Sequence, residues 1–220
     1  MFIKNLFLFL KEILIILFIQ YSIIILSILF LGFDSSIVWG TIFLTMFDII
    51  YIIWRSKILN VSFNFKISSF PYILLGTSIS IIYNMILFKY NLYSYSEVNI
   101  PLIINVISSA IIGPIFEEVL FRCSFISKLE KFISSNIVII LLSSFIFSIS
   151  HTNIFSMIIA FIVGIVNSYI YVKKRDFSSI CLFHIFVNLV SCFLCSYNIY
   201  ILVLGTILFV ISLLLIYSEE

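Results

Sequence analysis

Two adjacent glutamates interrupt an apolar stretch of the chain, within the sequence GPIFEEVLFR at residues 113–122. On an α-helix Glu118 and Arg122 lie four residues apart on one face, where an acid followed by a base can form an ion pair. Glu117 is rotated by about 100° from Glu118 and has no such partner. We therefore expect Glu118 and Arg122 to support the structure and Glu117 to act as a general base. The alternative for this segment is a purely structural charge cluster that locks helices together.

Both histidines of the chain also lie in or next to apolar stretches. Phe147 stands one helical turn before His151, and His184 stands one turn before Asn188, so each pair shares a helix face. A single histidine in an apolar helix is more often a packed core residue than a catalytic one. Two histidines, an amide and a carboxylate pair together indicate chemistry, because glutamate and histidine can polarise water while histidine and asparagine can stabilise an oxyanion. The predicted reaction is peptide-bond hydrolysis.

The composition indicates that the helices carrying these residues lie in a membrane. Of 220 residues, 63% are hydrophobic and only 10% are charged, whereas soluble domains carry about 25% charged residues. The net charge of +2 gives no indication of a nucleic-acid partner. The lipid bilayer is therefore the expected partner, and the fold class is predicted to be an all-α, polytopic transmembrane helical bundle.

A transmembrane helix needs about 20 apolar residues, and the chain contains about eight such stretches. We expect one transmembrane domain over residues 1–220, with three leading spans in residues 1–99 and a catalytic core over about residues 100–195. The predicted spans are Leu6–Leu31, Ile37–Trp54, Phe70–Phe88, Pro101–Phe121, Phe132–Ser150, Ile154–Val172, Phe177–Cys195 and Ile199–Tyr217.

The placement of basic residues predicts the orientation of these spans. With the N-terminus in the cytoplasm, Lys89 is the only basic residue expected in the segments on the opposite side. Such a bias is typical of cytoplasmic segments, so both termini are predicted to be cytoplasmic. The basic residues expected on the cytoplasmic side are Lys4, Lys11, Arg55, Lys57, Lys66, Lys128, Lys131, Lys173, Lys174 and Arg175.

Three motifs in order resemble those of the CPBP family, which comprises CAAX prenyl endopeptidases and bacteriocin-processing enzymes and is also called Abi. They are EExxxR at residues 117–122, FxxxH at residues 147–151 and HxxxN at residues 184–188. The preceding Gly113-Pro114 and the basic turn at residues 173–175 are similar to the family as well. The resemblance covers about residues 100–195.

The resemblance implies an intramembrane endopeptidase of the glutamate type. By motif position, Glu117 and His151 would activate water, His184 and Asn188 would form the oxyanion hole, and Glu118 and Arg122 would support them. The substrate would be a peptide or a membrane protein. The short chain resembles the bacterial branch, which is linked to bacteriocin maturation or self-immunity, and this implies a multi-pass protein of the bacterial plasma membrane.

A metal cofactor is the alternative mechanism for the same residues. Glu117, His151 and His184 could serve as zinc ligands with one open coordination position. We favour no metal, because the sequence lacks an HExxH helix and because Asn188 is a good amide donor but a poor zinc ligand.

Two other functions remain open. One is a non-hydrolytic membrane immunity or scaffold protein that binds a peptide or a partner. The other is a proton-coupled transporter, since intramembrane carboxylates and histidines also build proton relays. No paired broken helices or inverted repeats favour the transporter.

The depth of His151 is a difficulty for a shared site. Glu117 and His184 are predicted at similar depth, but in an upright helix His151 would lie more than about 10 Å away along the membrane normal. The residues can meet if the fifth span is short and tilted. They can also meet if that span begins inside the membrane after an irregular or re-entrant segment, which we predict at Ser124–Ser135.

Overall fold

The computed structural model describes residues 2–92, 100–151 and 153–218, with side chains from residue 7 onward, and this part of the chain contains helices but no strand. The predicted all-α polytopic bundle is confirmed. Six helices are long and apolar enough to cross a membrane, and two shorter apolar helices occupy the remaining predicted spans. The six are Phe7–Leu31, Phe33–Leu59, Ile67–Lys89, Leu102–Leu129, Ile154–Lys174 and Ile199–Ser218; the two are Asn136–Ile149 and Phe177–Ser191.

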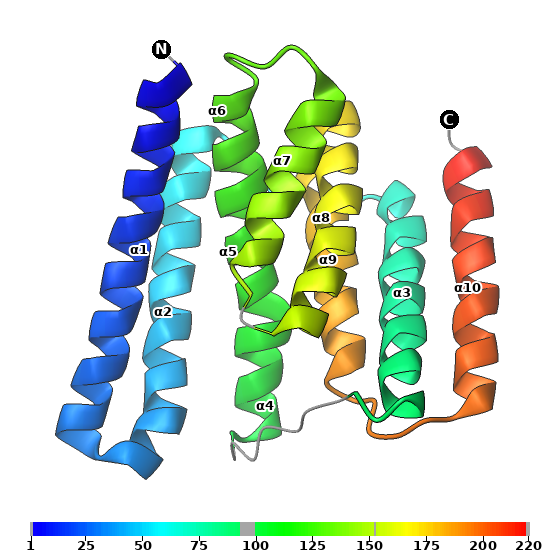
Figure 1. Cartoon of the computed structure of the whole chain (residues 1–220), viewed down its shortest axis with the longest axis horizontal. Coiled ribbons are helices and arrows are strands. Elements are labelled where there is room, and N and C mark those ends of the chain that lie inside the picture. The colour runs from blue at the N-terminus through cyan, green and yellow to red at the C-terminus, as the bar shows by residue number, and fades with distance from the viewer. Residues whose placement is uncertain (1, 93–99, 152, 219–220) are drawn as a thin grey trace.

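Successive apolar spans run in alternating directions, so that α1 (Phe2–Leu31) begins and α10 (Ile199–Ser218) ends at the same end of the bundle (Figure 1). The C-terminal end of α2 (Phe33–Leu59) and the joint between α8 (Ile154–Lys174) and α9 (Phe177–Ser191) lie at this end too. These segments carry most of the basic residues, whereas Lys89 ends α3 (Phe70–Lys89) at the opposite end. The arrangement has the two-sided charge distribution expected from the sequence.

The fourth span is longer than predicted, because it continues past Phe121 to Leu129. It consists of α4 (Leu102–Asn105), the π-helical segment η2 (Val106–Ile112), α5 (Gly113–Glu118), the π-helical segment η3 (Val119–Ile126) and α6 (Ser127–Leu129). The prediction of an irregular or re-entrant Ser124–Ser135 is therefore wrong for its first half, which is helical. π-Helical turns are rare and occur often at functional sites, and here two of them flank the helical turn that carries both glutamates.

The fifth helix brings His151 into the bundle by being short. α7 (Asn136–Ile149) has 14 residues, which corresponds to about 21 Å. It forms a hairpin with α8, and the turn between them lies short of the end of the bundle at which α4 begins (Figure 1). The hairpin is tightly packed, since a Cβ atom on Gly164 would lie 2.9 Å from Cα of Ser144.

Helix α9 packs against α3, α5, α8 and η2. A buried amide fixes it to α8, because Nδ2 of Asn167 donates to the carbonyl oxygen of Ile180 at 3.2 Å. The hairpin of α1 and α2 lies to one side of this core, and α10 covers the outer face of α3 on the other side (Figure 1). The resulting arrangement places α5, the α7–α8 turn and α9 around one cavity.

Candidate active site

A cavity of about 340 Å³ lies between α3, α5, the α7–α8 hairpin and α9. All four residues predicted to be catalytic line it, namely Glu117, His151, His184 and Asn188. The sequence therefore identified residues from three separate helical segments that the fold brings to one cavity. The other lining residues are Ser80, Tyr83, Asn84, Leu87, Leu92, Phe147, Asn153, Phe155, Ser156, Ile159, Ala160, Val163, Val187 and Ser191.

Glu118 lies behind the cavity and contacts two cationic or potentially cationic side chains. Its Oε2 lies 3.1 Å from Nε of Arg122, and both side chains are fully buried. Its Oε1 lies 2.7 Å from Nδ1 of His184, which is the donor because a carboxylate accepts. The spacing of the sequence predicted the pair with Arg122, whereas the contact with His184 was missed because it joins residues 66 positions apart.

Phe147 connects the buried arginine to both histidines. The guanidinium of Arg122 lies 4.4 Å from the centre of the Phe147 ring, and the same ring meets His151 and His184 edge to face, with centroids 5.2 and 5.7 Å away. Among the described residues, Nη1 of Arg122 has no hydrogen-bond partner. The aromatic face compensates in part, since a desolvated cation–π contact contributes about 2 kcal/mol.

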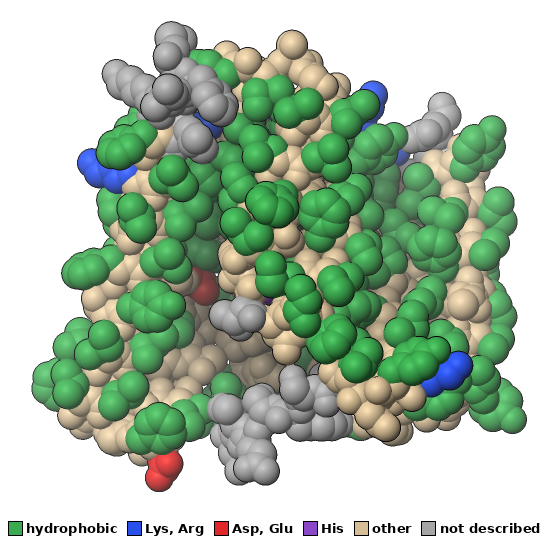
Figure 2. All heavy atoms as spheres, viewed as in Figure 1, with side chains coloured by type: hydrophobic (Ala, Val, Ile, Leu, Met, Phe, Trp, Pro, Cys, Tyr) green, Lys and Arg blue, Asp and Glu red, His purple; other side chains and the backbone are tan. Residues whose placement is uncertain are grey.

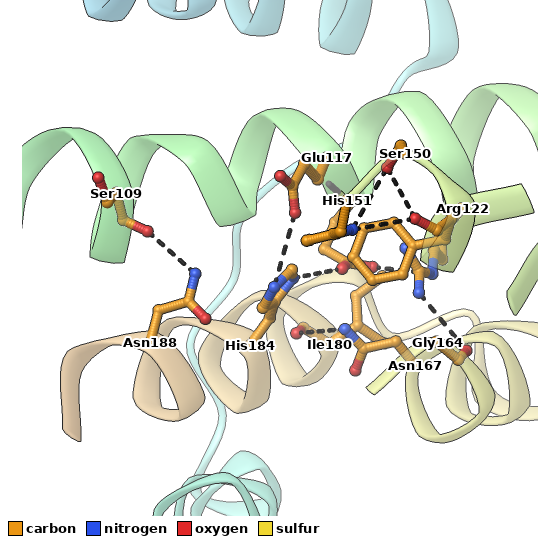
Figure 3. Close-up of polar contacts among 12 residues, drawn as sticks. Ser109, Glu117, Arg122, Ser150, His151, Gly164, Asn167, Ile180, His184 and Asn188 are labelled. Atoms are coloured by element: carbon orange, nitrogen blue, oxygen red, sulfur yellow. Dashed lines mark hydrogen bonds and ion pairs between the residues drawn. The ribbon is translucent and has the colours of Figure 1, made fainter. Parts of the chain in front are cut away.

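Glu117 is the carboxylate that faces the cavity. Its side chain is 31% exposed, and its Oε2 lies 3.6 Å from Nε2 of His184 (Figure 3). The two adjacent glutamates thus contact opposite nitrogens of one imidazole. As the helix geometry predicted, Glu118 is buried beside Arg122, whereas Glu117 is accessible from the cavity.

His151 reaches the cavity from the end of α7, beyond the last helical turn. Its Nδ1 lies 3.2 Å from the carbonyl oxygen of Phe147 and 3.4 Å from Oγ of Ser150. A histidine whose Nδ1 carries the proton would donate it to that carbonyl and present Nε2 as a base. The difficulty of depth is thereby resolved, because the turn that carries His151 lies within the bundle.

Asn188 lies one turn beyond His184 on the same face of α9 (Figure 3). Its Nδ2 donates to the carbonyl oxygen of Ser109 at 3.0 Å. Ser109 belongs to the π-helical segment η2. The sequence gave no signal for this acceptor, because a break in α-helical hydrogen bonding cannot be recognised from apolar residues alone. The second hydrogen of the amide group remains available to a ligand.

The described side chains of Glu117, His151 and His184 are not arranged as a group of metal ligands. Within residues 2–92, 100–151 and 153–218, no three His, Cys, Asp or Glu side chains are grouped so that they could hold a metal ion. Nδ1 of His184 is committed to Glu118, and the only contact described between the three candidate ligands is the one from Glu117 to His184. The arrangement therefore does not fit zinc bound by Glu117, His151 and His184.

Asp48, an acidic residue within α2, does not line the cavity. It accepts a hydrogen bond from Nε2 of Gln20 at 3.2 Å, which joins α2 to α1. Asp48 therefore helps to hold α2 against α1.

Residues 99–190 match the family model described as type II CAAX prenyl endopeptidase Rce1-like. All six predicted site residues lie inside the matched range, and the resemblance found in the sequence is confirmed. Neither the curated proteins nor the solved structures include a match to this chain.

Proposed function

Since residues 99–190 match the family model described as type II CAAX prenyl endopeptidase Rce1-like, we propose that the chain is an intramembrane endopeptidase whose general base is Glu117. The observation that carries this proposal is the convergence of Glu117, His151, His184 and Asn188 on one cavity. The cavity lies within a multi-pass helical bundle, so the scissile bond is cleaved at membrane depth.

In the proposed reaction, a water molecule held by Glu117 and His151 attacks the carbonyl carbon of the scissile peptide bond. Glu117 takes the proton of the water as the new C–O bond forms, and the carbonyl oxygen becomes the oxyanion. When the C–N bond breaks, Glu117 returns the proton to the leaving amine. The products are a carboxylic acid and an amine, and one water is consumed.

His184 and Asn188 supply the donors for the oxyanion. For Nε2 of His184 to donate to the oxyanion while Nδ1 donates to Glu118, the ring must carry both protons. The fixed contact of 2.7 Å with Glu118 holds the ring in place for this role. Removing one oxyanion donor from an acyl-transfer enzyme costs about 10²–10³ in kcat.

The decisive experiment compares purified wild type with Glu117→Gln on a quenched peptide library. We expect cleavage to fall by about 10²–10⁴-fold, because the amide cannot accept the proton of the water. Asp34→Asn is the matched control, since it removes an exposed carboxylate from the first turn of α2. Equal cleavage by wild type and Glu117→Gln would reject the proposal.

A chelator separates the glutamate mechanism from zinc catalysis in the same assay. The poor fit of the three candidate ligands to a metal supports the glutamate mechanism, so cleavage should survive chelation. Loss of cleavage with chelator and its recovery with added zinc would establish the metalloprotease instead.

We further propose that the chain is a protein of the bacterial plasma membrane and that it acts in bacteriocin maturation or self-immunity. This part of the proposal rests on the resemblance to the bacterial members of the family. Cells that produce the protein should lose immunity to the cognate bacteriocin when Glu117 becomes Gln. Immunity that persists in this variant would favour the non-hydrolytic scaffold, and proton-driven uptake without cleavage would favour the transporter.

A further inference from the structure

A second cavity, of about 300 Å³, lies where the end of α2, the end of α8 and the start of α9 meet, and it shares no lining residue with the first cavity. Three basic residues line it, namely Lys66, Lys174 and Arg175. Asp176 is the only acidic residue among its lining residues. The other lining residues are Leu59, Asn60, Val61, Ser62, Asn64, Tyr171, Phe177 and Ser178.

The acidic residue is already engaged in the fold. Asp176 caps α9, where its Oδ1 accepts from the backbone N–H of Ser179 at 3.1 Å and its Oδ2 accepts from Oγ of the same residue at 2.7 Å. Arg175 forms an ion pair with Glu130, which is not a lining residue, and the amine of Lys174 lies 5.7 Å from the ring centre of Tyr72. With three basic residues and one acidic residue, the lining has a net charge of +2.

The segment between α2 and α3 covers this cavity and has a polar side and an apolar side. Its side chains alternate, since Ser62, Asn64 and Lys66 line the cavity whereas Phe63, Phe65 and Ile67 are 47%, 63% and 89% exposed. Alternation of this kind is expected of extended backbone, in which successive side chains point to opposite sides.

The polar side of this segment is held against α9. The backbone N–H of Asn64 donates to Oγ of Ser178 at 2.8 Å, and the ring of Phe63 meets that of Phe177 edge to face at 6.4 Å. The segment therefore has one face fixed over a basic cavity, whereas the exposed side chains of Phe65 and Ile67 are placed to contact the acyl region of a bilayer.

We propose that this cavity binds the phosphate headgroup of an anionic phospholipid, with the acyl chains lying along the exposed Phe65 and Ile67. Basic cavities between transmembrane helices recognise such headgroups, and each cation near an anionic surface contributes about 1 kcal/mol. A free phosphate ion would use the same cations but would leave the exposed apolar side chains without a role. The proposal does not depend on the protease function.

The test measures lipid binding to the purified full-length protein by native mass spectrometry. Phosphatidylglycerol and phosphatidylcholine are titrated separately against wild type and a Lys66→Gln/Lys174→Gln double variant. We expect the double variant to bind phosphatidylglycerol at least about tenfold more weakly, with phosphatidylcholine binding unchanged. If the double variant fails to fold, Lys66→Gln alone should weaken phosphatidylglycerol about fivefold, because Lys66 lies on an exposed segment outside the helices.

The matched control is Lys57→Gln/Lys131→Gln, which removes two exposed charges that do not line the cavity. It should change phosphatidylglycerol binding by less than about twofold. Equal weakening in the control and in the site variant would overturn the proposal, because the lipid would then respond only to net charge. Displacement of the lipid by millimolar inorganic phosphate would overturn it too, by showing a site for free anions.

Discussion

Two clusters of charged residues hold this molecule together, and they differ mainly in their access to solvent. In the core, Glu118 lies between Arg122 and His184, and the three side chains are 0%, 0% and 5% exposed. At the side of the bundle, Glu12 of α1 contacts Arg55 and Lys128, with side-chain exposures of 15%, 14% and 21%. Each cluster has one carboxylate and two basic partners, but only the first is fully removed from solvent.

The helices that carry these two clusters also differ in how closely they pack. A Cβ atom added to Gly76, where α3 crosses α9, would lie 2.3 Å from the carbonyl oxygen of Phe183. A Cβ atom added to Gly40, where α2 crosses α1, would be 3.7 Å from the nearest atoms of Ser27. Hydrophobic side chains are spread over both regions on the face of the molecule that Figure 2 shows. The region that carries the proposed catalytic residues is therefore the more tightly packed one, and we expect it to tolerate change less.

The strongest test of this comparison replaces one arginine in each cluster. Arg122→Met should lower the free energy of unfolding by about 3–5 kcal/mol, because it leaves the buried carboxylate of Glu118 without its main counter-ion. Arg55→Met, its counterpart in the hairpin, should cost about 1 kcal/mol or less. Unfolding in mixed detergent micelles, titrated with dodecyl sulfate, measures both.

A compensating variant checks the cause. Glu118→Gln/Arg122→Met removes both charges, so it should be more stable than Arg122→Met alone. A double variant that shows the full sum of the two single losses would mean that the pair contributes no interaction energy of its own.

The second test concerns helix packing. Gly76→Ala should cost about 1–3 kcal/mol, as overpacking does, because the nearby atom belongs to the backbone and cannot rotate away. It should also reduce peptide cleavage, since His184 directly follows Phe183. Gly40→Ala should leave stability equal or higher, because alanine is the better helix former by about 1 kcal/mol. Unfolding and peptide cleavage are measured on the same preparations of both variants. Equal losses of stability and of cleavage in Gly76→Ala and Gly40→Ala would contradict this prediction.

The comparison also explains what the sequence could predict. Helix-face arguments use short separations, and they correctly placed Glu118 with Arg122 and separated Glu117 from that pair. Within the described residues, hydropathy identified the six long and two shorter apolar helices. The sequence gave no indication of the contact from Glu118 to His184 or of the bond from Asn188 to Ser109, because each depends on how α9 packs against the fourth span. The depth of His151 depends on the length of α7, which hydropathy overestimated because residues 132–135 are not helical.

The smallest effect is expected in the cluster of Glu12, Arg55 and Lys128, and it concerns how the stability from this cluster depends on salt. Glu12 accepts from the hydroxyl of Tyr51 at 2.8 Å, and its Oε2 lies 2.5 Å from Nζ of Lys128. Glu12→Gln should cost about 0.5–1 kcal/mol at low salt, because part of the hydrogen bonding survives in the amide. In about 1 M salt this difference should become smaller, since the Debye length is then about 3 Å and the three side chains are partly exposed.

The loss caused by Arg122→Met provides the internal control, because it should persist at high salt. No water or counter-ion can replace a guanidinium whose side chain is fully buried. If both losses disappeared together with added salt, the two clusters would be equally accessible to ions, and the distinction between a sealed core and a solvated hairpin would be wrong.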